Sequence, residues 1–587
     1  MRSVRYLILW TMILVAIYPS NVVSGATAPL TTLDRINAPY LPDGIYYRHT
    51  AVAWLGQVTP DENYSDVRVG YDNSEIFIHV ATFDRRLWYD TSPSPADLTN
   101  WDAVTIYLNK DGNTGSALTA NAYRFDGQLN WWESRSSWQA AYRGNSGQWV
   151  TTPMSFTTAT DFAWESTTEG GLNVDQNNRG WSIEFRVPFS SLGISVPPQG
   201  TIWGLGVAVH DRDSAAGPPR ADKAWPVALN GTQPVSWGQL RFGLPTYAPD
   251  QPAVSRGQTM VRQGLNGASV PDAQVGGWTN CGQNVADYFA GWGSINYAGG
   301  TIFNVQNQTK LADWPCFAKY YVTFPLGSVP AGKVIISATV TLRQFGNAGE
   351  GWDPGPTPSF IQVLSVNDDW SENTLTWNNA PLARENLGEL EVDPLTNPGY
   401  PGVPRIWDVS RAVAESYAAG APVRLAFYSA DSDMHSGRYF YSSDFTDAAV
   451  RPTLVVTWGD PIGSLKKSVW PVTVTQNDRV TYTLALLGTG QAMTLTDDLP
   501  ANVSQPGQIS ATGGTAFYNA AKRQITWIGT IAAGQPITLT FPVTNLLGVS
   551  GAIVNEAVLT DTIAGTSTAS AAFIANAALV WLPVLRR

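Results

Sequence analysis

The chain has 587 residues, of which 47 are acidic and 36 are basic, so its formal net charge at pH 7 is −11. This acidic balance, without a dense cluster of Lys and Arg, argues against nucleic acid as a partner, because binding to phosphates needs a concentrated positive patch. The 53 Gly, 39 Pro and 24 Trp are typical of short strands joined by turns.

The first residues have the pattern of a secretory signal. Two arginines precede an apolar run over 6–18, and small residues follow at 24–26. This pattern predicts a cleavable signal peptide over 1–26. The alternative is a membrane anchor, but a spanning helix needs roughly 20 apolar residues and this run is shorter. No later stretch is long and apolar enough to span, so we expect a secreted or cell-surface protein without a transmembrane span in the mature chain.

Two joints rich in Pro and Gly divide the rest of the chain. They predict linkers at 246–257 and 459–463. The segments between them differ in composition, since the first is rich in Trp and the last is rich in Thr, Ala and Val. We therefore expect three modules, at 30–245, 258–458 and 464–577.

Strand patterns dominate all three segments. Trp181, Ile183, Phe185 and Val187 alternate with polar residues, and this period of two predicts a half-buried strand. Helical periodicity is convincing only near 409–419. Many short strands separated by turns predict an all-β fold of three consecutive antiparallel β-sandwich modules.

Residues 30–245 resemble carbohydrate-binding modules of family nine, through the phrases DVRVGYDNSEIFIHVATFD, WDAVTIYLNKDGNTG, YRFDG, GWSIEFRVPFSSLG, WGLGVAVHDRD and WGQLRFG. That family holds a sugar between two Trp faces, while Arg, Glu and Gln bind its hydroxyls. The resemblance implies that Trp101 is a stacking residue and that Arg124 binds sugar. Thr105 and Ala208 stand where the family has Glu and Gln, and the second Trp has no clear counterpart beyond Trp225 nearby. The alternative is this fold without the family's standard sugar site.

Two further tryptophans of the first segment are candidates for sugar stacking. Trp132 and Trp138 lie among polar residues, which favours exposed rings. Trp131 precedes Trp132 directly, so in a strand the two would face opposite ways. Core packing is the alternative for any one of these side chains.

The turn NKDGNTG (109–115) is a candidate calcium loop. Asn109, Asp111 and Asn113 stand at alternating positions, as calcium-binding loops require. Ala120 stands where the bidentate acid is expected, and a hairpin turn explains Asp-Gly-Asn equally well. Asp211 and Asp213 in HDRD are a second candidate, with a solvated turn as the alternative. We expect no cofactor, or calcium.

Residues 258–458 resemble the DNRLRE, or disaggregatase-related, domain. The resemblance is carried by WSENTLTWNNAP (370–381), YVTFPLGSVPAGKVIISATVTL, IWDVSRAVAESYAAG and YFYSSDFTDAAVRPTLVVTW. It implies a secreted β-sandwich found beside polysaccharide-degrading and cell-surface proteins, with no known catalytic centre.

This middle segment also holds the two cysteines of the chain, Cys281 and Cys316. In an oxidising compartment such a pair usually forms a disulfide. Closing the loop would stabilise the module by about 4 kcal/mol. The alternative is two buried thiols that never meet.

Residues 462–577 resemble the repeat called domain of unknown function eleven, an immunoglobulin-like unit of bacterial surface proteins, through SLKKSV, QNDRVTYTLAL, MTLTDDLP, ITWIGTIAAGQPITLTFPV and IVNEAVLT. The resemblance implies a spacer or adhesion role. Some related stalk domains form a Lys–Asn isopeptide bond promoted by a buried acid. Lys466 or Lys467, Asp497 and Asn555 occupy plausible places for it, with a polar cross-strand contact as the alternative. Residues 578–587 resemble a C-terminal sorting tail, with a plain last strand as the alternative.

These observations favour a non-catalytic exported bacterial protein that binds polysaccharide or a cell-wall or matrix glycan. One alternative is an enzyme or accessory component of glycan breakdown. Glycosidases need two carboxylates that flank the scissile bond, but the adjacent pairs 368–369 and 497–498 would point to opposite faces of a strand. The chain has only 4 His. The other alternative is a structural adhesin without a sugar site.

Overall fold

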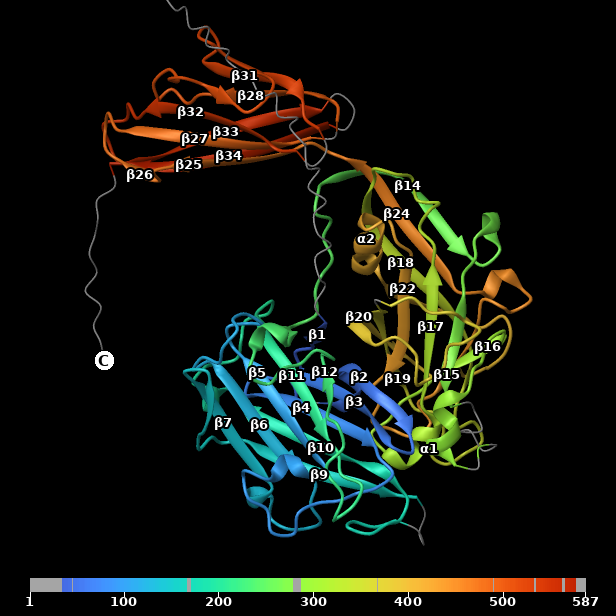
Figure 1. Ribbon diagram of the computed structural model, residues 1–587. Coiled ribbons are helices and arrows are strands. Elements are labelled where there is room, and N and C mark those ends of the chain that lie inside the picture. The colour runs from blue at the N-terminus through green and yellow to red at the C-terminus, as the bar shows by residue number, and fades with distance from the viewer. Residues whose placement is uncertain are drawn as a thin grey trace, which may run out of the picture. The chain divides into compact units, whose positions relative to one another are not determined.

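The computed structural model describes residues 34–576, apart from 45, 166–169, 278–284, 286, 367, 489, 533–534 and 562–564. The predicted signal peptide and the sorting tail lie outside the described residues. Within them β-strands are the dominant regular structure and helices are few and short, which confirms the predicted all-β class (Figure 1). Among the described helices, none has the length and apolar character needed to cross a membrane.

The first module packs two sheets around one core. One sheet has the order β2-β3-β4-β10-β9, and the other contains β1-β13-β11-β5-β6-β7-β8, with β12 beside β11. In β10 the predicted alternation holds, since Trp181, Ile183, Phe185 and Val187 all lie in the core. The strands are β1 (Arg35–Ala38), β2 (Ala51–Thr59), β3 (Glu62–Tyr71), β4 (Glu75–Phe83), β5 (Ala103–Asn109), β6 (Ala122–Gln128), β7 (Gln139–Asn145), β8 (Gln148–Thr151), β9 (Thr157–Trp164), β10 (Asn178–Pro188), β11 (Ile202–His210), β12 (Lys223–Trp225) and β13 (Gly238–Phe242).

The middle module is a second two-sheet sandwich with its own core. Its sheets have the orders β15-β17-β22-β19-β20 and β14-β24-β18-β23-β16, with β21 beside β18. The helix predicted near 409–419 is α2 (Ser410–Ala418), and a short helix α1 (Tyr288–Gly291) precedes β16. The strands are β14 (Ala253–Arg262), β15 (Asp272–Gly276), β16 (Ile302–Val305), β17 (Ala318–Phe324), β18 (Val334–Asn347), β19 (Ser359–Val366), β20 (Ala383–Val392), β21 (Val403–Asp408), β22 (Val423–Ser429), β23 (Arg438–Tyr441) and β24 (Thr453–Pro461).

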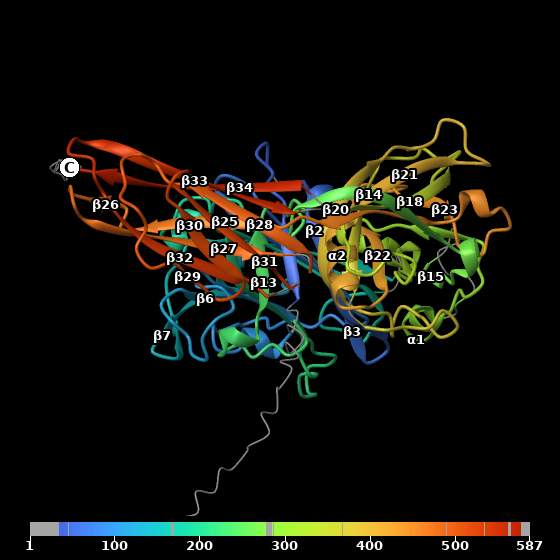
Figure 2. The ribbon, with the colours of Figure 1, turned by 90° about the horizontal axis from the view of Figure 1, so that it is seen from above.

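The third module encloses a separate core between sheets of order β25-β27-β32-β29 and β26-β34-β33-β28-β31-β30. Figure 2 labels these strands, which are drawn as orange to red ribbons. They are β25 (Ser464–Trp470), β26 (Thr473–Val474), β27 (Arg479–Leu487), β28 (Ala492–Asp498), β29 (Ser510–Ala511), β30 (Thr515–Asn519), β31 (Gln524–Thr530), β32 (Ile537–Thr544), β33 (Gly551–Asp561) and β34 (Gly565–Ala575).

The segments predicted as linkers contain strand residues. β14 begins at Ala253 and pairs with β24, so that Ala253 lies opposite Pro461 and Ser255 lies opposite Gly459. Pro and Gly at the ends of two paired strands therefore produce the local composition of a linker while the backbone remains in a ladder. The module boundaries themselves stay a prediction.

The first and middle modules share a sheet and a core. β1 pairs with both β13 and β20, which joins strands of both modules into one 13-stranded sheet. A hydrophobic cluster also unites Trp54 and Phe83 of the first module with Trp314, Tyr321 and other residues of the middle module. The sequence divides these residues into two modules, and the structure connects the two through this shared core and sheet.

Candidate functional site

The outward face of the β5-β6-β11 sheet in the first module carries a connected row of polar side chains. Strand register places Thr105 of β5 opposite Asp126 of β6 and Ala208 of β11, and it places Arg124 opposite Tyr142. Because side chains alternate along a strand, this face turns away from the core that Val104 and its neighbours fill. The row lies where the family nine resemblance places a sugar site.

Asp126 is the centre of this row. Arg124 donates from Nε to Asp126 Oδ1 at 2.8 Å, and its Nη2 lies 2.7 Å from Asp126 Oδ2 in an ion pair. The Thr105 hydroxyl donates to Asp126 Oδ1 at 2.8 Å, and His210 Nε2 lies 2.9 Å from the same hydroxyl. His210 Nδ1 lies 2.9 Å from Asp222 Oδ1. Burial alone would lower the pKa of Arg124, but Asp126 raises it above its ordinary value, so Arg124 is a fixed cation beside Tyr142.

A cleft of about 710 Å³ adjoins this face, within the ~300–1,000 Å³ range of small-molecule sites. Tyr107, Ala208 and Asp222 line it from the first module. The middle module contributes residues 378–380 and Leu382, so the segment WNNAP forms part of the wall.

Asn378 of that segment connects the two modules. Its Oδ1 accepts a hydrogen bond from the Val58 amide at 2.7 Å, and its Nδ2 donates to the Val58 carbonyl at 2.9 Å. The Gln57 side chain donates to the Asn378 carbonyl at 2.7 Å. This pairing holds the middle module against the end of β2, which closes the cleft on that side.

Trp101 lies just before β5, and its ring is partly buried. The Arg212 guanidinium stacks on it, with Cζ 4.3 Å from the ring centre. One face of the indole is therefore already occupied by a cation. Trp225, the nearest candidate for a second stacking residue, is buried in the core with 1% of its surface exposed.

A second aromatic surface, which we call the aromatic platform, consists of Trp131, Trp132, Phe162 and Trp164. Trp131 stacks on Phe162 at 5.3 Å and on Trp164 at 5.9 Å, and Trp132 meets Trp131 edge-on at 6.0 Å. Trp132 is 74% exposed and Trp131 is 42% exposed. The sequence singled out Trp132 but not its two partners from β9, which lie about 30 residues further along the chain.

Trp138 does not belong to this surface. It is 8% exposed, packs in the core of the first module, and donates from its indole nitrogen to the Asp90 carbonyl at 2.8 Å. The polar residues before it form a short 3-10 turn (Arg135–Ser137), while the ring itself is buried and has little surface left for a sugar.

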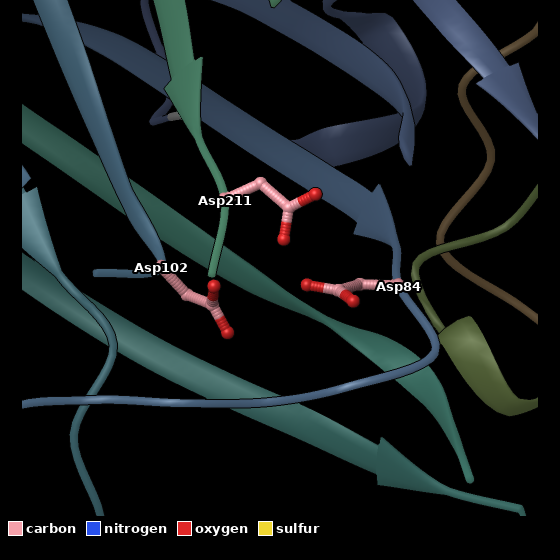
Figure 3. Close-up of side chains that lie close together, drawn as sticks. All are labelled: Asp84, Asp102 and Asp211. Atoms are coloured by element: carbon pink, nitrogen blue, oxygen red, sulfur yellow. The ribbon is translucent and has the colours of Figure 1, made fainter. Parts of the chain in front are cut away.

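Three buried aspartates form a candidate cation site at one end of the first module (Figure 3). Asp84 follows β4, Asp102 precedes β5 and Asp211 follows β11, and their side chains point toward one another. One carboxylate oxygen of each lies within 4.8 Å of the others. Burial raises the pKa of all three, for Asp211 to about 7, and their mutual repulsion adds to the effect for Asp84 and Asp102.

The hydrogen bonds of this acidic cluster leave room for a ligand. Asp102 accepts from the amides of Trp88 and Arg212, at 2.7 and 2.8 Å. Asp84 Oδ2 and Asp211 Oδ1 are buried and make no hydrogen bond of normal geometry with the described residues, although Asn63 is close enough to lower the pKa of both carboxyls. Several carboxylate oxygens close enough to bind one ion are the ligands that calcium prefers. The sequence named only Asp211, although an aspartate directly at the end of each of three strands was a signal that they could meet at one edge of the sandwich.

In the predicted calcium loop, the three candidate ligand side chains make hydrogen bonds to other groups of the protein. Asn109 donates from its amide to the Gly112 carbonyl at 2.7 Å, as in an ordinary turn. Asp111 accepts from Thr119 and Asn121, at 3.0 and 2.8 Å. Asn113 accepts from the Gln239 amide at 3.2 Å. The three side chains therefore stabilise the β5–β6 connection with bonds inside the protein, and calcium at this loop stays a prediction.

The remaining predicted sites lie in the other modules. Cys281 lies outside the described residues, so its disulfide with Cys316 stays a prediction. In the third module, Asp497 and Asn555 are buried, whereas Lys466 is exposed and points away from both. Lys467, its neighbour, is the lysine that faces Asp497, because strand alternation turns it toward the core.

The model of carbohydrate-binding module family 96 matches residues 289–458. Comparison with curated proteins found no match. Among solved structures, the chain is similar to a carbohydrate-binding module of family 9 from Caldicellulosiruptor kristjanssonii in complex with cellotriose, with 16% identity and a TM-score of 0.26 over 37% of this chain and 100% of that chain. It is also similar to the C-terminal domain of an antigen I/II-family protein from Streptococcus pyogenes, with 11% identity and a TM-score of 0.17 over 52% of this chain and 99% of that chain.

At these identities and TM-scores the two structural likenesses carry no conclusion about a ligand. The family match is different in kind, because it rests on the sequence of the middle module itself. Part of this chain, residues 289–458, is therefore similar to a known carbohydrate-binding module.

Proposed function

We propose that this chain is an exported, non-catalytic protein that binds polysaccharide, with the glycan held in the cleft beside Arg124 and Asp222. The observation that carries this proposal is the match of residues 289–458 to a carbohydrate-binding family. That segment includes the turn that forms one wall of the cleft.

The lining of the cleft suits a sugar chemically. Leu55, Leu382 and the Tyr107 ring offer apolar surface for the C–H face of a pyranose. Asp222 and the Glu62–Lys223 pair, whose charged atoms lie 3.0 Å apart, offer acceptors and a donor for hydroxyls. Polar groups at the rim of an apolar wall orient a ligand that has one apolar face.

The aromatic platform is a second place where the same glycan could bind. Stacking one sugar face on Trp buries roughly 100 Å², which is worth about 2.5 kcal/mol before the cost of association. The platform alone would hold a sugar weakly. A long polysaccharide that reaches both places would gain from the high effective concentration of the second site.

The runner-up is a catalytic or accessory role in glycan breakdown. The adjacent acids 497 and 498 do point to opposite faces, since the first is buried and the second is exposed. A reducing-end assay on a polysaccharide panel separates the two roles. Release above background that is lost on changing one acidic residue would favour the enzyme.

Binding is tested with a glycan array on the full chain, followed by calorimetric titration with the best oligosaccharide. Arg124→Lys and Tyr107→Ala should each weaken binding at least several-fold, because the first loses the planar fork and the second loses apolar wall. Trp101→Ala should also weaken it if the family's stacking position is in use. Trp352→Ala is the matched control, since that ring is 72% exposed in the middle module.

The pattern of losses locates the site. If Trp132→Ala abolishes binding while Arg124→Lys and Tyr107→Ala do not, the platform is the site and the cleft is not. If no glycan binds the wild-type chain, the structural alternative replaces this proposal.

A further inference from the structure

The strands by which the chain enters and leaves the third module run in the same direction. β26, which continues the entry strand β25, pairs in parallel with the last strand β34, so that Thr473 lies opposite Ile574 and Val474 lies opposite Ala575. The longer ladders of this module, such as β25 with β27 and β33 with β34, are antiparallel. A parallel pair thus joins the entry point of the module to its exit point.

Hydrogen bonds connect these two segments at both ends. The Ile574 amide donates to the Val472 carbonyl at 2.8 Å. Nearer the start of β25, the Leu465 amide donates to Ser567 Oγ at 3.3 Å. The offset between the bonded residues hardly changes along the chain, so residues 465–474 lie side by side with β34.

Asn576 fastens the end of β34 to the entry segment. Its backbone has a φ of 51°, a left-handed conformation that asparagine adopts more readily than most residues. Its amide donates to the Val474 carbonyl at 2.7 Å, and its Oδ1 accepts from the Gln476 amide at 2.9 Å. Its Nδ2 donates to the carbonyls of Leu547 and Val549, at 2.7 and 3.0 Å. One residue therefore ties the exit point to the entry segment and to a neighbouring loop.

The same segments are also anchored in the core of the module. Leu465 and Val469 of β25, Val474 of β26 and Phe573 of β34 belong to its hydrophobic cluster. Sliding the entry segment along β34 would pull these side chains out of their packing positions, and exposing apolar surface to water is unfavourable.

The direction of the strands decides how tension acts on them. β24 of the middle module ends at Pro461 and β25 begins at Ser464, so tension from the middle module enters the third module through β25. Tension on the other side leaves through the end of β34. Parallel strands that are pulled from opposite ends slide past each other, and their hydrogen bonds are loaded together. Antiparallel strands that are pulled apart from one shared end open one bond at a time.

We propose that the third module is a load-bearing clamp, in which residues 465–474 and β34, closed by Asn576, resist tension along the chain. This role goes beyond glycan binding and does not depend on it. The rate at which a module unfolds under force is set by its unfolding barrier. In this module that barrier includes the joint rupture of the entry–exit bonds.

Single-molecule force spectroscopy on the full chain tests the clamp by comparing two directions of pulling. In the first, the chain is held by its two ends. In the second, one handle is attached at Ser550→Cys and the other at the C-terminal end. Gly551 lies opposite Ala575, so the second direction opens the antiparallel β33–β34 pair from one end. Unfolding of the third module, identified by its contour length, should need a several-fold higher force in the first direction.

A variant and a matched control test the part played by Asn576. Asn576→Ala should lower the unfolding force measured between the two ends of the chain. Asn519→Ala is the control, because that side chain accepts only from the Lys522 amide, at 3.2 Å, in the turn between β30 and β31. It should unfold at the wild-type force. Circular dichroism checks that both variants are folded.

Equal unfolding forces in the two directions would overturn the clamp, and this comparison uses the native entry and exit strands. A folded Asn576→Ala variant that unfolds at the wild-type force would overturn the closure by Asn576. The measurements need no glycan, so their outcome is separate from that of the binding experiments.

Discussion

Lys319 Nζ of the middle module lies 4.2 Å from the ring centre of Trp54 in the first module. The rings of Tyr64, Trp377 and Tyr428 lie 3.8 to 5.1 Å from the same nitrogen, which is fully buried. Burial lowers the pKa of Lys319, and the Asp66 carboxylate opposes that shift. Aromatic rings from the first and the middle module thus surround the Lys319 amine. This part of the interface therefore needs residues of both modules.

We expect the first two modules to unfold as one cooperative unit. Trp54→Ala removes an indole from the shared core and should destabilise both modules by about 3–5 kcal/mol, the usual cost of deleting a buried Trp. Differential scanning calorimetry should show one transition for these modules in the wild type and a separate one for the third. Two well-separated transitions for the first two modules in the wild type would contradict the shared core. Trp352→Ala, which removes an exposed ring, is the control and should leave the transition in place.

We expect a divalent cation to stabilise the first module through Asp84, Asp102 and Asp211. A ligand that binds only the folded state at 100 times its Kd adds about 2.7 kcal/mol. Millimolar calcium should therefore raise Tm, and chelator should lower it. Asp84→Asn should abolish the response, whereas Asp111→Asn in the turn after β5 should not. If Asp111→Asn abolishes the response and Asp84→Asn does not, the cation binds at the loop of Asn109, Asp111 and Asn113.

The stability of the middle module should fall as pH rises from 3.8 to about 7. Burial raises the pKa of Asp272 from 3.8 to about 7, although hydrogen bonds from Tyr320 and Ser443 oppose the shift. The folded state binds this proton more tightly than the unfolded state, so the contribution is present below pH 3.8 and is lost as pH rises through about 7. Urea unfolding across this range should give a negative slope that Asp272→Asn reduces, despite its lower absolute stability. An unchanged slope in Asp272→Asn would assign the pH dependence to other groups.

We expect Cys281 and Cys316 to form a disulfide in the exported protein. Both lie in one module of a chain with the pattern of a secretory signal, and disulfides persist in that compartment. Thiol titration of the unfolded protein without reductant should find no free thiol. Two reactive thiols in protein purified from an oxidising compartment would contradict the prediction.

Local alternation alone determined much of the fold. A period of two along β10 or β25 states which side chains share a face, and this property depends only on backbone geometry. The same rule excluded the adjacent acids 497 and 498 as a flanking pair. The residues at 51–55 are apolar on both faces of their strand, which is typical of a sheet covered on both sides.

The tertiary structure alone decided which faces meet. Lys466 and Lys467 are equivalent as residue types, and only the position of the core relative to β25 turns Lys467 toward Asp497. Asp84, Asp102 and Asp211 are separated by long stretches of sequence, and the pairing of their strands brings the carboxylates together. The same holds for Trp131 with Trp164 and for Lys319 with Trp54. Contacts of this kind depend on register and packing between distant strands, so a local pattern can place a residue on a face or at a strand end but does not determine which residue it meets.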